Sequence, residues 1–324
     1  MRAALCREYG APDVVRVEDV APPQLGDGQV RIRVRAAAVN YPDVLLVANE
    51  YQVKVPTPFV PGSEFAGLVA EVADGVTEPA VGDRVSGTGL VGAFTEELVV
   101  PAEGVRRIPD AVDDRSAAAF GVSHRTAYNV LRSVARVRAG EELLVLGAAG
   151  GVGLATVQLG ALLGASVTAV ASSQGKLEVA SSYGARNLVN HRAGDLRPAL
   201  REILPQGGDA VVDPVGGSLS EPALRTLRWG GRFVTVGYAS GVVPRIPLNL
   251  VLLKGVHVLG FEFGAFAAYA ADELDRNEQE LLGLLADRRV RPHIGATFGL
   301  DDAAAALRYV ADGKAVGKVV VDVA

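Results

Sequence analysis

Cysteine is almost absent from this sequence, because Cys6 is the only one among 324 residues. A single cysteine excludes a disulfide within the chain and a zinc site built from several thiolates. The histidines are equally sparse and stand far apart, at His124, His191, His257 and His293. Without clustered thiol or imidazole ligands, we expect no bound metal.

The chain also lacks an excess of positive charge. It has 32 Lys and Arg against 37 Asp and Glu, and its net charge is -5. This balance argues against nucleic acid or an anionic membrane as the main partner. No stretch reaches the length of a bilayer span without a charge or a glycine, and the first eight residues lack the apolar core of a signal peptide. We therefore expect a cytoplasmic protein with neither a nucleic-acid nor a membrane partner.

The length of the chain and its changing pattern predict two domains of the α/β class. Residues 1–121 contain short strand-like runs between turn-forming clusters, which indicates an irregular antiparallel β domain. Residues 122–261 alternate apolar strands with helices, which predicts a doubly wound parallel sheet covered on both faces. Residues 262–324 are too few to fold alone and end in a predicted strand, so we expect them to rejoin the first domain.

A glycine-rich turn follows the predicted strand at 143–146 and precedes an apolar helix. The cofactor candidates of this turn and its flank are Gly147, Gly150, Gly151, Val152 and Gly153. Glycines let a diphosphate approach the main chain, and the helix start offers free N–H groups and a positive dipole end. Ala149 occupies the middle position of the usual G-x-G-x-x-G pattern, and a purely structural turn is the alternative. The surrounding strands and helices favour a dinucleotide.

The segment after the second predicted strand favours NADPH over NADH. An NAD site usually carries an acidic residue about 20 positions beyond the glycines, but residues 168–176 contain none. Ser172, Ser173 and Lys176 instead supply the hydroxyls and positive charge that suit a 2′-phosphate. The alternative for Lys176 is an ordinary solvated place in a helical first turn, so the missing acid carries more weight.

Several motifs, in order, make the chain resemble the medium-chain dehydrogenase/reductase superfamily, and specifically its zinc-free quinone oxidoreductase branch, which includes zeta-crystallin. The matching segments are 38–43, 61–67, 81–85, 147–153, 213–217 and 313–318. The resemblance implies a GroES-like catalytic domain over 1–121 and 262–324 and a Rossmann NADPH-binding domain over 122–261. It also implies a nicotinamide in the cleft between the domains. The apolar last Rossmann strand, at 256–259, is expected at a sheet edge, where it would pair two subunits of a homodimer.

The zinc alcohol dehydrogenases of the same superfamily are the rival. Asn40 stands where those enzymes carry their first cysteine ligand, and Ser63 replaces the histidine of their Gly-His-Glu segment. The loop of four cysteines is missing as well. The resemblance therefore implies hydride transfer from NADPH, without a metal, to a small conjugated carbonyl compound such as a quinone or an enone.

The catalytic candidates lie at Asn40, Tyr41 and Tyr51. Asn40 would donate a hydrogen bond to the developing oxyanion, and the tyrosines would supply flat walls and a phenolic proton. The alternatives are a turn in which Asn40 and Asp43 satisfy backbone groups, and simple packing by Tyr51. Further cofactor contacts are expected from Thr126, His191, Gly237, Tyr238, Phe261, Phe263 and Lys318.

Three functions remain open. The first is an NADPH-dependent quinone reductase. The second is an enone or enoyl-thioester reductase, which would need basic residues for a CoA tail, whereas residues 51–59 offer only Lys54. The third is a crystallin-like protein that binds NADPH without turnover.

Overall fold

The computed structural model describes residues 1–323 and divides into two compact units. Unit 1 comprises residues 1–122 and the chain from residue 291 onward, and unit 2 comprises residues 123–290. The first predicted boundary, at 121, lies next to this division. The predicted return at 262 comes before α9 (Phe263–Tyr269) and α10 (Ala271–Ala286), and both helices belong to unit 2.

Unit 1 is built around a mixed sheet, which agrees with the predicted GroES-like β domain. Its strands run in the order β14 (Ile294–Gly299), β15 (Lys318–Asp322), β3 (Gln29–Val39), β4 (Glu64–Val72), β5 (Arg84–Thr88) and β7 (Val105–Arg107). β6 (Glu97–Pro101) also pairs with β3, and β1 (Arg2–Cys6) pairs with β2 (Val15–Asp19). β15 pairs with β3, so the C-terminal strand belongs to the sheet of unit 1.

The residue pattern of β3 explains which face of this sheet is buried. Val30, Ile32 and Val34 are fully buried, whereas Arg33 and Arg35 are exposed. Alternation of this kind places successive side chains on opposite faces of a strand. The apolar face packs against α1 (Tyr41–Val47) and α11 (Ala303–Ala311) in one hydrophobic core.

Short helical elements complete unit 1. Asp113 caps α2 (Asp114–Ala118), where its side chain accepts a hydrogen bond from the Ser116 N–H at 2.9 Å. The 3₁₀ turns are η1 (Pro12–Val14), η2 (Ala102–Gly104) and η5 (Leu300–Asp302).

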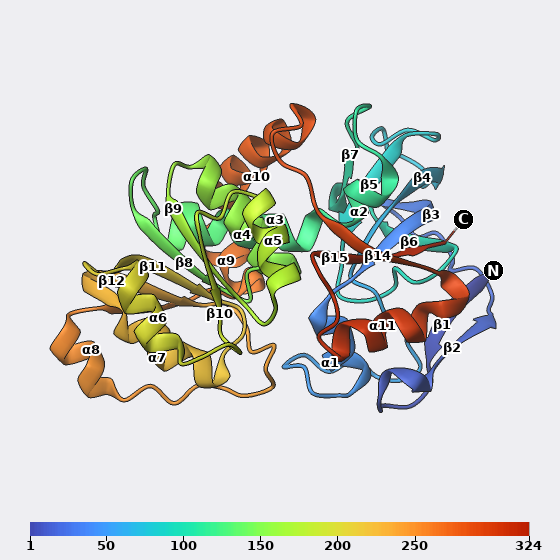
Figure 1. Cartoon of the computed structure of the whole chain (residues 1–324). Coiled ribbons are helices and arrows are strands. Elements are labelled where there is room, and N and C mark those ends of the chain that lie inside the picture. Colours follow the sequence, from blue (N-terminus) through green and yellow to red (C-terminus); the bar gives the residue numbers. More distant parts are fainter. Residues whose placement is uncertain (324) are drawn as a thin grey trace. The chain divides into compact units, whose positions relative to one another are not determined.

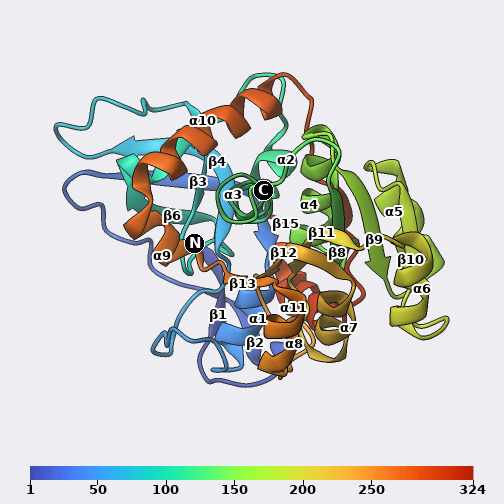
Figure 2. The ribbon, with the colours of Figure 1, turned by 90° about the vertical axis from the view of Figure 1, so that its left-hand side faces the viewer.

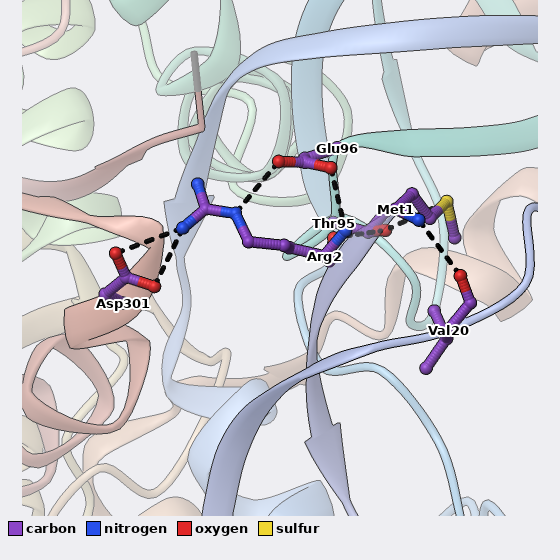
Figure 3. A network of polar contacts seen from close by, with 6 residues as sticks. All are labelled: Met1, Arg2, Val20, Thr95, Glu96 and Asp301. Carbon is purple, nitrogen blue, oxygen red and sulfur yellow. Dashed lines mark hydrogen bonds and ion pairs between the residues drawn. The ribbon is translucent and has the colours of Figure 1, made fainter.

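Arg2 links three parts of unit 1 that are distant in sequence (Figure 3). Its Nε donates to Glu96 at 3.0 Å and its Nη1 donates to Asp301 at 3.0 Å. The Met1 amino group donates to the Val20 carbonyl at 3.0 Å. These bonds hold the first strand against the turn before β6 and against η5.

Unit 2 is a parallel sheet with helices on both faces, the predicted Rossmann arrangement (Figure 1). The strand order is β10 (Asn187–Asn190), β9 (Ser166–Ala171), β8 (Glu142–Leu146), β11 (Gly208–Asp213), β12 (Leu227–Thr235) and β13 (His257–Gly260). β13 lies at an edge of this sheet, as predicted for the last strand.

The two faces of the unit 2 sheet are covered by different helices. Leu144 and Leu146 belong to a core with residues of α6 (Leu196–Ile203), α7 (Ser220–Arg225) and α8 (Leu248–Lys254). The opposite face meets α4 (Gly151–Leu162), since a Cβ at Gly160 would lie 2.5 Å from Leu143. α5 (Gln174–Ser182) contacts β9 and β10, as Figure 2 shows, and η4 (Gly217–Leu219) leads into α7.

The sequence pattern over 123–137 predicts one helical run, and the chain is helical there through Val134 but not as a single α-helix. The structure has α3 (Gly121–Asn129) and then a π-helical turn, η3 (Val130–Val134), closed by the Ala135 N–H on the Val130 carbonyl at 2.7 Å. The physical reason is a buried polar contact, because Asn277 of α10 donates to Asn129 Oδ1 at 2.8 Å and to Ser133 Oγ at 2.9 Å. Among the described residues, no helix is long and apolar enough to cross a membrane.

Candidate functional site

The glycine turn of unit 2 forms a tight strand-to-helix connection. Gly147 follows β8 with a φ of +58°, in the left-handed region that favours glycine. A Cβ at Gly153 would lie 2.0 Å from the Gly147 carbonyl oxygen, so the first turn of α4 can approach the loop only with glycine there. The predicted glycine positions therefore meet in one compact turn.

The start of α4 fits a diphosphate. Gly150 is its N-cap and makes no side-chain capping bond. The N–H groups of Gly151, Val152 and Gly153 open the helix, where backbone donors lack helical partners and the dipole is positive. These residues would hold the diphosphate of a dinucleotide.

The predicted 2′-phosphate residues gather beyond β9 and β10. Asn190 pairs with Ala171, and the His191 N–H donates to the Ala171 carbonyl at 3.1 Å, which brings His191 beside Ser172. Ser173 caps α5 and accepts from the Lys176 N–H at 3.4 Å. This arrangement puts the hydroxyls, the lysine and the histidine at one end of the sheet.

Arg192 adds a second cation to this group, and sequence reasoning missed it. Burial lowers the pKa of Lys176 and of His191, and the positive charge of Arg192 lowers both further. Three basic side chains are thus close enough to repel one another, as suits a site for a dianion. The only hint in the sequence is that Arg192 directly follows His191.

An aromatic group forms after the last strand of unit 2. The Phe261 ring lies 6.2 Å from that of Phe263, edge to face, and 5.4 Å from that of Phe266. The Arg125 guanidinium lies 4.6 Å above the Phe263 ring, so Phe263 meets the middle of α3 next to Thr126. Arg125 contacts Phe263 and directly precedes Thr126, so it lies between two of the predicted cofactor residues. Nothing in the sequence suggested this role for Arg125.

Gly237 and Tyr238 follow β12, at the carboxyl edge of the sheet. A Cβ at Gly216 would lie 2.9 Å from the Tyr238 ring, so Tyr238 covers the turn after β11. Their contact with a cofactor stays a prediction.

In unit 1, Asn40 belongs to a buried polar cluster with Glu64 and Lys318, which are 7%, 1% and 4% exposed respectively. The Lys318 ammonium donates to Glu64 Oε1, to Asn40 Oδ1 at 2.6 Å and to the Val39 carbonyl at 3.3 Å. Asn40 Nδ2 donates to Glu64 Oε1 at 2.9 Å, and Glu64 Oε2 accepts from the Val122 N–H at 2.8 Å. Every charge in the cluster is compensated.

Lys318 was predicted to reach the cofactor. The structure gives its ammonium three oxygen partners within unit 1, and a cofactor contact of Lys318 stays a prediction. The ion pair between Lys318 and Glu64 was not apparent from the sequence, since the two residues are 254 positions apart.

Asp43 and Ser63 border the cluster. Asp43 is fully buried, and its Oδ2 accepts from the Asn40 N–H at 2.7 Å. Ser63 is partly exposed, and its Oγ accepts from Asn40 Nδ2 at 3.1 Å. Burial raises the pKa of Asp43 to about 7, against the lowering effects of the Asn40 N–H, Ser63 and Lys318, and the Glu64 charge raises it further.

The two tyrosines lie on the same stretch as Asn40. Tyr41 opens α1 and is partly buried, which raises its pKa, and the Glu50 charge raises that pKa further. Tyr51 is partly buried and packs against the core of unit 1, as its structural alternative proposed. A catalytic role for either stays a prediction.

The donor set around Asn40 does not fit a catalytic zinc. Catalytic zinc takes three protein ligands from His, Cys, Asp or Glu, whereas this cluster offers an amide, a hydroxyl and a carboxylate bonded to an ammonium. Across the described residues, no group of three or more His, Cys, Asp or Glu is placed to hold a metal ion.

We expect Gly153→Ala to unfold more easily and to bind NADPH weakly. The added methyl would overlap the Gly147 carbonyl, and overpacking typically costs about 1–3 kcal/mol. Gly283→Ala is the matched control, because a Cβ there meets no described atom within 4 Å. Urea unfolding and NADPH fluorescence titration measure both effects. Equal behaviour of the two variants would contradict the tight turn.

The buried Asp43 predicts a pH-dependent stability. Its folded pKa of about 7 lies above the value of about 3.9 for an unfolded chain. The folded state therefore binds the proton more tightly, and this contribution is complete below about pH 4 and lost by about pH 7. Between pH 5 and 7, wild type should lose about 1.4 kcal/mol per pH unit more than Asp43→Asn.

Urea unfolding at a series of pH values measures this slope. Asp110→Asn, at an exposed carboxylate, is the control and should follow wild type. Parallel slopes for wild type and Asp43→Asn would show that Asp43 is ionised throughout.

Models of two protein families match the chain. The alcohol dehydrogenase GroES-like domain matches residues 26–110, within unit 1, and the zinc-binding dehydrogenase family matches residues 151–278, within unit 2. The second description names a metal for which the donor set described above is unsuited.

Individual relatives extend over nearly the whole chain. Quinone oxidoreductase-like protein 2 of Bos taurus is 36% identical over 98% of this chain and 91% of its own length. The mycobacterial protein Rv1454c complexed with NADPH has a TM-score of 0.92 at 31% identity, with both chains fully covered. Escherichia coli quinone oxidoreductase complexed with NADPH has a TM-score of 0.92 at 26% identity, again with full coverage. The chain therefore belongs to the quinone oxidoreductase branch of the medium-chain dehydrogenase/reductase superfamily.

Proposed function

We propose that this protein is an NADPH-dependent quinone reductase that works without a metal. The observation that carries the proposal is the glycine turn at α4 together with the basic group of Lys176, His191 and Arg192 beyond β9. A diphosphate and a 2′-phosphate would each meet suitable donors there. Two related structures are described as NADPH complexes, which supports the same cofactor here.

Bound NADPH supplies a hydride, which a conjugated carbonyl compound can accept directly. The residues of this chain then orient the dinucleotide, exclude water and stabilise the oxygen on which negative charge develops. The buried cluster of Asn40, Glu64 and Lys318 satisfies its own hydrogen bonds, so it can act on that oxygen only through the partly exposed Ser63 hydroxyl, which accepts from Asn40 Nδ2. A Lewis-acidic metal is therefore unnecessary to this proposal.

Quinones are the favoured acceptors. The segment around Tyr51 carries one cation, Lys54, whose ammonium donates to the Asn49 carbonyl. A CoA thioester would require several basic groups for its phosphates, so the enone or enoyl-thioester alternative is less well supported. The name of the Bos taurus relative points to the same acceptor class.

A homodimer is proposed through the β13 edge of unit 2. Val258 on that strand is exposed, and Leu248 and Leu252 on α8 are 79% and 78% exposed. An apolar edge strand beside exposed leucines invites pairing with a second copy. A two-fold axis at β13 would continue the sheet across both subunits.

NADPH consumption with a panel of quinones and a crotonyl thioester tests the function. We expect turnover with quinones, weak turnover with the thioester and a clear preference for NADPH over NADH. Lys176→Ala and Arg192→Ala should each weaken NADPH binding about 10- to 100-fold and leave NADH binding unchanged, because each removes a charged hydrogen-bond donor. Preference for NADH, or tight NADPH binding without any turnover, would contradict the proposal.

The dimer is tested by light scattering in solution. Wild type should have twice the mass of the chain, and Val258→Asp should halve it by placing a buried charge in the interface. Val81→Asp is the control, because Val81 is 61% exposed and belongs to unit 1. A monomeric wild type would rule the interface out.

A further inference from the structure

The hydrogen bonds around Asn40 have a single possible direction. An ammonium only donates, so Asn40 must present Oδ1 to Lys318 and Nδ2 to the Glu64 carboxylate. A flipped amide would place its NH₂ against the ammonium and its oxygen against the carboxylate. The positive charge of Lys318 therefore fixes the amide, and the amide in turn donates to Ser63 Oγ at 3.1 Å.

This direction makes Asn40 a poor donor to a substrate. Its two amide hydrogens already meet Glu64 and Ser63, and its side chain is buried. The next group along the chain of donors is Ser63, which is partly exposed and accepts from Asn40, and a hydroxyl that accepts can also donate. A hydroxyl that accepts a hydrogen bond becomes a stronger donor itself.

Asp43 is a neighbour of Ser63. Its carboxyl is fully buried, and Oδ1 has no hydrogen-bond partner with good geometry in the described part of the chain. The Ser63 hydroxyl lies close enough to hydrogen-bond that carboxyl, and this bond lowers the pKa of Asp43 against the larger raising effect of burial. An unpartnered oxygen in a dry site is the position at which a proton is retained most readily.

We propose that Ser63 delivers the proton to the acceptor oxygen and that Asp43 replaces it, while Asn40 and Lys318 hold Ser63 in position. The proposal rests on the proposed reductase function, because it names the donor for the oxygen of that acceptor. Ser63 is then a catalytic residue, whereas Asn40 and Lys318 are positioning residues.

The acceptor that has taken up a hydride carries one negative charge on oxygen. The Ser63 O–H bond breaks as the O–H bond of the reduced acceptor forms, and the Asp43 O–H proton moves to Ser63 Oγ. Asp43 is left as a carboxylate and regains a proton from water, so one acceptor, one hydride and one proton give one reduced product.

The ionisation of Asp43 agrees with this role. Its pKa of about 7 keeps part of the population protonated at neutral pH. The charged groups that act on it are Lys318, which lowers the pKa, and Glu64, which raises it. Activity should therefore be highest below about pH 7 and fall about tenfold per unit above it, since the acid form is the one that donates.

The kinetic test compares Ser63→Ala, Ser63→Thr and Asp43→Asn with wild type. Ser63→Ala should lower kcat/KM for quinones about 10²-fold, as loss of a general acid does, with the affinity for NADPH unchanged. Ser63→Thr, which keeps a hydroxyl, should recover most of the activity. Asp43→Asn should lower the rate and flatten its pH profile, whereas a purely structural role would lower the rate equally at every pH. Ser86→Ala, at a partly buried serine on β5, is the control and should match wild type.

Binding of 4-nitrophenolate to the NADP⁺-loaded protein decides the question without turnover. The phenolate oxygen imitates the anionic oxygen of the acceptor, so Ser63→Ala should bind it about 10-fold more weakly than wild type. Infrared spectra should also show a carboxylic acid band that titrates near pH 7 and is missing in Asp43→Asn. If wild type reduces no acceptor, the reductase function is overturned. Phenolate binding then still tests whether the Ser63 hydroxyl donates to an anionic oxygen. Equal phenolate affinity in wild type and Ser63→Ala, or no binding to either, overturns the role of Ser63.

Discussion

The site in unit 1 depends on the buried ion pair between Lys318 and Glu64. Removing two charges from water is expensive, and such a pair persists only when every donor and acceptor around it is used. Here the ammonium has three oxygen partners, and the carboxylate accepts from the ammonium, an amide and a backbone N–H. Loss of either partner would leave a bare charge in a dry site, at a cost of about 3–5 kcal/mol.

The same pair joins elements that the chain order keeps apart. Lys318 begins β15 and Glu64 begins β4, and both strands flank β3, whose end leads into Asn40. Correct pairing of the C-terminal strand with the N-terminal domain is therefore a condition for a correctly oriented Asn40. The orientation of the Asn40 amide thus depends on this one ion pair.

The fold was predictable because its signals are local. Alternation in β3, apolar strands separated by helices, and the glycine turn each lie within a few residues, and the motif resemblance extended them to the whole chain. The π-helical turn η3 was not predictable, since it follows from a buried contact between Asn129 and Asn277, 148 residues away. Local helical preference was outweighed there by a tertiary hydrogen bond.

The site was predictable in part for the same reason. Asn40 and the glycines follow from motifs, but the direction of the hydrogen bonds through Asn40 depends on Lys318, which no local pattern links to it. Arg192 and Arg125 matter through the side chains that they approach in space, His191 and Phe263. Residue types indicate candidates, whereas their roles emerge only from the contacts of the folded chain.

The central claim is that the proposed quinone reductase needs no metal ion. Single-turnover quinone reduction after exhaustive dialysis against a chelator tests this claim most directly. The metal-stripped protein, loaded with NADPH deuterated at the transferred position, should keep its full rate and show a primary isotope effect. Loss of the rate on dialysis, with recovery on addition of Zn²⁺, would contradict the mechanism.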